Sequence, residues 1–337
     1  MHYSIDTTII EIADATRKSC PTEHMLMLQF GDCTIKVLAN KPEITSSLNE
    51  YFGPFVIDAT DSDIEITVHE IVPPTFETEF TVKQPDPGKT KIKEEFIDFS
   101  DGRIVRKRLT EMIFVFGNGT NLAIGPCMDN LNQVVNFVNN RYIEWELSKG
   151  SLLGHAAAVT WKGQGIAMAG FSGAGKSTLS LHLMSKGTDF VSNDRLMVNL
   201  DGNDLVMRGV AKLPRINPGT ILNNKDLIGI LSDEEKAEFL ELPKEELWQL
   251  EHKFDVPIDQ CFGDSKFYLK APMKLLVLLN WKREEGETFI QEVDLSERQD
   301  LLPAFMKSTG LFFCPAEDSH VNPANNEDYV DVLNHCR

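Results

Sequence analysis

The chain has 337 residues, of which 42% are apolar, 25% charged and 9% aromatic, a balance that is typical of a globular protein and excludes intrinsic disorder and collagen-like repeats. At this length about two domains are expected. The 51 acidic and 33 basic residues give a formal charge of −18, which disfavours nucleic acid or an anionic membrane surface as a partner. Residues 151–229 differ, with 8 basic and 5 acidic residues, so the global charge does not argue against a local phosphate ligand.

The six cysteines are scattered, without a CxxC pair or histidines at zinc-finger spacing. We interpret them as reduced thiols. The N-terminus has no basic and apolar leader, so a cytoplasmic protein is expected. No apolar run reaches the length of about 18 residues that a membrane-spanning helix needs.

Residues 1–148 are predicted to form a smaller α/β (α+β) domain of unknown role. The pair Gly31-Asp32 separates two largely apolar runs and therefore predicts a β-hairpin. A long amphipathic helix begins after Asp129 or Asn130 and ends near Gly150, where the domain boundary is placed. The other expected elements are a helix over 41–52, strands over 64–71, 95–99, 104–109, 111–116 and 122–124, and an exposed loop over 82–92.

Residues 149–337 are predicted to form an α/β domain with a mixed sheet. Its first strand is expected to run unbroken over 152–161 and to turn back into a second strand over 166–169. The further expected elements are a helix over 176–186, a short strand over 190–192, a hairpin of 196–200 with 205–207, acidic helices over 233–250 and a strand over 274–281.

The strongest motif follows the strand that ends at Ala169. The segment Gly170-Phe171-Ser172-Gly173-Ala174-Gly175-Lys176-Ser177 matches GxxxxGK[ST] between a predicted strand and a predicted helix. Glycines let backbone N–H groups turn towards phosphates, and the helix N-terminus adds partial positive charge there. ATP is the expected ligand, with the lysine on the β- and γ-phosphates. The residues predicted to bind ATP are Gly170, Ser172, Gly173, Ala174, Gly175, Lys176, Ser177 and Thr178.

Asp194 follows Lys176 after one helix and one short strand, at a spacing of 18 residues. That position predicts a carboxylate at the carboxyl end of a neighbouring strand, close to the phosphates. Ser177 and Asp194 are therefore the predicted ligands of Mg²⁺, directly or through water. The alternative interpretation of Asp194 is a turn residue that starts the next hairpin.

Three further features are weaker by themselves. His155 lies in the apolar strand before the loop, where a lone histidine is more often a structural core residue than a functional one. Arg208, Lys212 and Arg215 lie in a segment rich in glycine and proline that is either a clamp for phosphate or an acidic acceptor, or a solvated basic loop. Arg215 is the best single candidate of these.

Together, these residues resemble the C-terminal domain of HPr kinase/phosphorylase. A histidine on a strand, a P-loop and an Asp-Asp-Arg motif occur in that family at the spacing of His155, the glycine-rich loop and Asn193-Asp194-Arg195. The stretches 153–159 and 187–195 look closest to the HprK-related kinases of B type, and the resemblance covers residues 147–210. It implies a fold related to phosphoenolpyruvate carboxykinase, ATP and Mg²⁺ as cofactors, and a homo-oligomer by analogy. It also implies that His155 orients or tunes the catalytic acidic residue.

Two positions depart from that family. Its general base is replaced by Asn193, whose amide cannot take a proton at neutral pH, and the glutamate after the P-loop serine is replaced by Thr178. The catalytic residues are thus predicted to be His155, Asn193, Asp194 and Arg215, with His155 or Asp194 as the replacement base or Asn193 orienting the acceptor.

The predicted function is an ATP- and Mg²⁺-dependent kinase that phosphorylates a hydroxyl of an unknown protein, peptide or small polyol. A nucleotide-binding switch that binds ATP without phosphoryl transfer is the alternative, because Asn193 replaces the base. A phosphoenolpyruvate carboxykinase ranks lower, since no lysine and histidine pair for its second metal was found. The short spacing from Lys176 to Asp194 disfavours a motor or DNA-handling ATPase.

Overall fold

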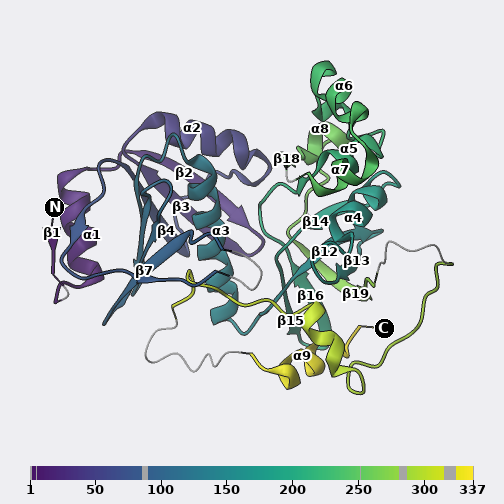
Figure 1. Ribbon diagram of the computed structural model, residues 1–337. Helices are drawn as coiled ribbons and strands as arrows, with labels where there is room; N and C mark the ends of the chain where they lie inside the picture. Colours follow the sequence, from purple (N-terminus) through teal and green to yellow (C-terminus); the bar gives the residue numbers. More distant parts are fainter. Residues whose placement is uncertain are drawn as a thin grey trace. The chain divides into compact units, whose positions relative to one another are not determined.

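The computed structural model describes residues 2–4, 6–85, 90–250, 252–280, 287–314 and 324–336 (Figure 1). It divides the chain into two compact units. Unit 1 comprises Met1–Ser148 and Thr309–Val321, and unit 2 comprises Lys149–Ser308 and Asn322–Arg337. The predicted second domain, 149–337, is therefore interrupted, because a segment near its C-terminal end belongs to unit 1.

Unit 1 is built on an eight-stranded mixed sheet. The predicted hairpin at Gly31-Asp32 is confirmed, since the two strands on either side of it pair in antiparallel register. A two-stranded sheet of β1 (His2–Tyr3) and β5 (Thr75–Phe76) accompanies it. The order of the large sheet is β2 (His24–Phe30), β3 (Cys33–Ala39), β4 (Ile64–Glu70), β10 (Thr120–Gly125), β9 (Ile113–Gly117), β8 (Gly102–Lys107), β7 (Glu94–Phe99) and β6 (Thr81–Val82).

Helices cover both faces of this sheet. Helix α1 (Ile9–Ser19) starts at a capping box of Thr8 and Glu11, and its apolar residues pack against one face of the sheet. The other face is covered by α2 (Pro42–Tyr51), which leads into the short helix η1 (Gly53–Phe55), and by α3 (Leu131–Ser148) (Figure 1). The pleat of β9 explains both layers, because successive residues point to opposite faces.

The segment near the C-terminus belongs to unit 1 because of Phe312. Its ring lies 5.5 Å from Phe114, 5.7 Å from Phe116 and 6.1 Å from Phe137 between centroids. The buried guanidinium of Arg141 also donates a hydrogen bond to the Phe312 carbonyl oxygen. Aromatic packing of this kind fixes the segment on the α3 side of the sheet.

Unit 2 is built on a seven-stranded mixed sheet. The predicted single strand over 152–161 is wrong: it breaks at His155, because β11 pairs with β15 whereas β12 pairs with β13 and β14. The strand predicted over 274–281 begins four residues earlier, and Trp281 lies outside the described residues. The order is β11 (Leu152–Gly154), β15 (Leu196–Asp201), β16 (Asp204–Arg208), β19 (Lys270–Leu278), β13 (Gln164–Ala169), β12 (Ala156–Trp161) and β14 (Asp189–Ser192).

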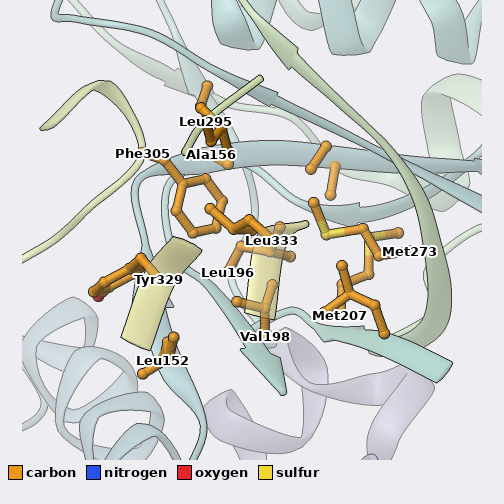
Figure 2. Close-up of a cluster of buried hydrophobic side chains, with 14 of the residues drawn as sticks. Leu152, Ala156, Leu196, Val198, Met207, Met273, Leu295, Phe305, Tyr329 and Leu333 are labelled. Atoms are coloured by element: carbon orange, nitrogen blue, oxygen red, sulfur yellow. The ribbon is translucent and has the colours of Figure 1, made fainter. Parts of the chain in front are cut away.

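Alternate side chains of β12 pack into two apolar layers, one on each face of the sheet. Ala157 and Val159 pack with α4 (Lys176–Met184), α5 (Pro218–Leu222) and α8 (Ile258–Phe262). Ala156 and Ala158 pack on the opposite face with η3 (Gln299–Ala304) and α9 (Asn326–Leu333), in the cluster that Figure 2 shows. The remaining elements are β17 (Arg215–Ile216), which pairs with β18 (Phe254–Asp255), and η2 (Ile228–Ile230), α6 (Asp233–Glu241) and α7 (Lys244–Gln249).

Unit 2 is thus an α/β unit with helical layers on both sides of a mixed sheet. In the part of the chain that the structure describes, no helix is both long and apolar enough to cross a membrane.

Candidate nucleotide site

The glycine-rich loop joins the end of β13 to the start of α4. Gly173 has φ +82° and Gly175 has φ +86°, a backbone region in which a side chain would be strained. Gly175 is the N-cap of α4, so the first N–H groups of the helix are directed into the loop. The side chains of Phe171 and Ser172 are exposed, whereas Ala174 and Ser177 are half-buried. The predicted strand–loop–helix context of the motif is therefore confirmed.

Lys176 folds back over this loop. Its Nζ donates hydrogen bonds to the carbonyl oxygens of Gly170 at 2.7 Å and Phe171 at 3.3 Å, and the residue is 8% exposed. Burial lowers the pKa of the Lys176 ammonium, and Lys307 lowers it further, whereas Asp194 raises it. The described residues place no carboxylate within ion-pair distance of Lys176. A buried cation held by neutral oxygens favours an anionic ligand.

Asp194 follows the end of β14. This strand is not adjacent to β13, since β12 lies between them, but both run in the same direction and so end at the same edge of the sheet. The Oδ1 atom of Asp194 lies 3.1 Å from His155 Nε2, and Oδ2 lies 3.5 Å from Lys307 Nζ and 3.9 Å from Arg195 Nε. Burial raises the pKa of the Asp194 carboxyl, but the His155 hydrogen bond and these charges outweigh it and hold the pKa well below its usual value.

His155 occupies the break between β11 and β12 instead of a position inside one strand. Its backbone N–H donates to the Phe305 carbonyl oxygen at 2.5 Å, which fixes the break, and its ring faces Asp194. The side chain is 30% exposed. His155 is therefore not a satisfied core residue of an apolar strand.

Asn193, between β14 and Asp194, is half-buried. Its amide oxygen is buried without a hydrogen-bond partner within the protein. An unsatisfied buried amide oxygen is costly, which makes this position unusual for a purely structural asparagine.

Lys307 belongs to this site and was not predicted from the sequence. It lies 113 residues after Asp194, directly behind the apolar residues Phe305 and Met306. Its backbone N–H donates to the Leu153 carbonyl oxygen at 3.1 Å. The only sequence signal was a lysine at the end of a short apolar run, which is too common to indicate a site.

The three basic residues Arg208, Lys212 and Arg215, which the sequence places in one segment, have different surroundings in the structure. Arg208 is 7% exposed and donates a hydrogen bond to the side chain of Asn199, so the structure places it in the sheet and not in a loop. Arg215 lies in β17 and pairs with Asp255 at 3.2 Å. Lys212 is close enough to Asp194 and Arg195 for their charges to act on it. Burial is the main cause of its lowered pKa; the charge of Arg195 lowers the pKa further, and that of Asp194 raises it.

Two hydroxyl groups of α4 differ in their surroundings. Thr178 exchanges a hydrogen bond of 3.0 Å with Thr220 of α5, which ties α4 to that helix. Ser177 is half-buried at the first turn of α4.

Asp194 is 53% exposed and has a lowered pKa, so its oxygens remain charged and accessible.

This donor set fits Mg²⁺, which is bound in phosphate-transfer sites by one or two protein oxygens together with water and substrate phosphates. The described residues contain no group of three or more histidine, cysteine, aspartate or glutamate side chains that could hold a metal ion.

Comparisons with known proteins show a distant similarity to solved structures. No protein-family model matches the chain, and no curated protein matches it. Among solved structures, the chain is similar to the Hpr(Ser) kinase/phosphatase from Coxiella burnetii, with 17% sequence identity over 40% of this chain and 64% of that chain. The chain thus spans less than two thirds of that protein, and the TM-score is 0.25. A TM-score this low does not establish a common fold.

Proposed function

We propose that unit 2 is an ATP- and Mg²⁺-dependent kinase that transfers the γ-phosphoryl group to a hydroxyl acceptor. The observation that carries this proposal is the combination of a buried Lys176 on the glycine-rich loop with Asp194 at the same edge of the sheet. The resemblance of the motifs to HPr kinases supports the same class of reaction.

In this function Lys176 exchanges its carbonyl partners for phosphate oxygens. The N–H groups at the start of α4 and the loop then surround the phosphates with fixed donors. Ser177 and Asp194 would hold Mg²⁺, which would supply positive charge next to the phosphates. The acceptor is a serine of a protein or peptide, or a small polyol.

The proton of the acceptor hydroxyl needs a base other than Asn193. Asp194 is ionised and half-exposed, and its Oδ1 is oriented by His155. Asp194 or His155 takes the proton, or Asn193 instead orients the acceptor hydroxyl by a hydrogen bond. A weak base is sufficient where the transition state is loose and positioning supplies most of the catalysis.

The test is transfer of radiolabel from [γ-³²P]ATP to an acceptor in an extract of the source cells. We expect label on one acceptor with the wild-type protein and none with Lys176→Met. Tight ATP binding by the wild type without any labelled acceptor would contradict a kinase.

The second candidate is a nucleotide-binding switch, which Asn193 favours because the binding residues are present and the base of the resembled family is replaced. The substitution Asn193→Asp distinguishes the two. In a switch it creates transfer activity that the wild type lacks, whereas in a kinase it leaves the activity unchanged or lowers it. ATP affinity measured on both proteins serves as the control.

A further inference from the structure

Four consecutive residues, Ala304–Lys307, hold the candidate site together; we call them the strap. The carbonyl oxygen of Ala304 accepts a hydrogen bond of 3.1 Å from Gly170 N–H at the start of the loop. In the strap, the carbonyl oxygen of Phe305 also accepts a hydrogen bond from the His155 N–H. Met306 pairs with Gly154 in an antiparallel bridge.

The ring of Phe305 anchors the strap. It is fully buried in the cluster of Figure 2 and lies over Gly154, where an added Cβ would be 2.3 Å from the ring. The backbone of Lys307 is therefore fixed by packing on one side and by its hydrogen bond to Leu153 on the other. A side chain that starts from such a fixed point reaches a defined target.

That target is Asp194. The Lys307 ammonium lies 3.5 Å from Oδ2, while Oδ1 is occupied by His155. Two of the cations here, Lys307 and Arg195, lower the pKa of Asp194 against the opposing effect of its burial. Asp194 in turn raises the pKa of Lys176 and of Lys212, which burial lowers. Asp194 is thus the carboxylate on which this group of cations converges.

A metal ion and an ammonium at one carboxylate repel each other. The metal arrives with nucleotide phosphates, whose negative charge offers the ammonium new partners. We propose that Lys307 is the counter-ion of Asp194 in the nucleotide-free site, and that it yields this carboxylate to the metal–nucleotide complex and turns to the phosphate oxygens. The inference rests on the proposed function, and it assigns Lys307 first to Asp194 and then to the nucleotide phosphates.

A purely structural ion pair behaves differently. Lys266 and Asp189, at the other end of β14, lie 2.6 Å apart with side chains that are 31% and 27% exposed. Lys307 is comparably exposed at 24%, so Lys266→Met is a matched control for the loss of one half-buried cation in the same unit.

The experiment measures, by calorimetry, the Mg²⁺ concentration that half-saturates binding of the non-hydrolysable analogue AMP-PNP. In Lys307→Met we expect this concentration to fall by about 3- to 10-fold, because a competing charge is removed from the metal ligand. Lys307→Arg keeps the charge and restores the wild-type value, and Lys266→Met leaves it unchanged. If Lys307 only held Asp194 in place, Lys307→Met would raise the required Mg²⁺ concentration.

Turnover gives the second readout. Loss of a phosphate-facing cation lowers kcat by about 10- to 100-fold in Lys307→Met, with partial recovery in Lys307→Arg. A rise or no change in the Mg²⁺ requirement of Lys307→Met overturns the inference. Failure of the wild type itself to bind Mg²⁺ with AMP-PNP overturns the proposed function instead.

Discussion

One buried cation from each unit, Arg141 in unit 1 and Lys176 in unit 2, can be compared by its partners. In unit 1, Arg141 is 2% exposed, donates to Glu144 and to the Phe312 carbonyl oxygen, and lies over the rings of Phe116 and Phe137. In unit 2, Lys176 is 8% exposed and donates to two neutral carbonyl oxygens of its own loop. Burial lowers the pKa of both groups.

The difference separates a structural cation from one available to a ligand. Arg141 has a carboxylate, a carbonyl and aromatic faces, so its charge is compensated within the protein. Lys176 donates to two carbonyl oxygens and has no carboxylate within ion-pair distance among the described residues, on a loop whose backbone conformation favours phosphate. Burial alone therefore does not identify a functional cation, whereas the kind of partner does.

Removing Lys176 has the largest expected effect on function. Lys176→Met should abolish detectable phosphoryl transfer, a loss of about 10³-fold or more, because the phosphates lose their buried cation. The free energy of unfolding should stay the same or rise, since the desolvated charge disappears. Radiolabel transfer and urea unfolding measure the two quantities, and a marked loss of stability would contradict the distinction from Arg141.

Removing Arg141 should give the opposite pattern. Arg141→Met is expected to lower the free energy of unfolding by about 3 kcal/mol, because Glu144 and the Phe312 carbonyl lose a buried partner. Affinity for Mg²⁺ with AMP-PNP should not change. The exposed pair of Arg298 and Asp300 provides the control, since Arg298→Met should leave the free energy of unfolding essentially unchanged.

A smaller change, made in β11 beneath the strap, tests the comparison further. Gly154→Ala places a methyl group 2.3 Å from the ring of Phe305, so the strap must shift. We expect a loss of about 1–3 kcal/mol in the free energy of unfolding together with a lower kcat. Gly163→Ala probes an exposed turn in the same unit where nothing lies near the added atom, although its φ of +75° adds some strain of its own. A normal kcat in Gly154→Ala would contradict a role for the strap in positioning the site.

The pH dependence of stability should show the smallest effect. The pKa of Asp194 is depressed in the folded protein below the ordinary value of 3.8, so its stabilising contribution is complete above that value. The difference in unfolding free energy between the wild type and Asp194→Asn should be constant above about pH 5 and shrink as the pH falls below about 4. It should stay below about 1 kcal/mol, because Asp194 is half-exposed. A difference that vanishes already near neutral pH would contradict the depressed pKa.

The glycine-rich loop and its flanking elements could be predicted from the sequence because all the information lies in eight consecutive residues. The same holds for the hairpin at Gly31-Asp32, where turn chemistry is local. The break of the first strand of unit 2 at His155 could not be predicted. The apolar run is continuous there, and the break arises because β11 and β12 pair with different partners.

Contacts between residues far apart in sequence account for the other differences. Lys307 meets Asp194 where Phe305 packs over Gly154 and the Lys307 backbone bonds to Leu153, and no local pattern indicates this. Thr309–Val321 belongs to unit 1 although it follows most of unit 2 in the sequence. This assignment depends on the ring of Phe312, which packs against three phenylalanines that are far away in the sequence. Arg208 resembled a loop residue by its glycine and proline neighbours, but strand pairing of β16 places it in the sheet.

The most direct measurement is a crystal structure of the protein with AMP-PNP and Mg²⁺. We expect Lys176 Nζ to leave the Gly170 carbonyl and to lie about 3 Å from a phosphate oxygen, with the metal at Asp194 and Ser177. A structure in which the nucleotide binds elsewhere, while Lys176 still donates to Gly170, would contradict the assignment of this loop as a nucleotide site.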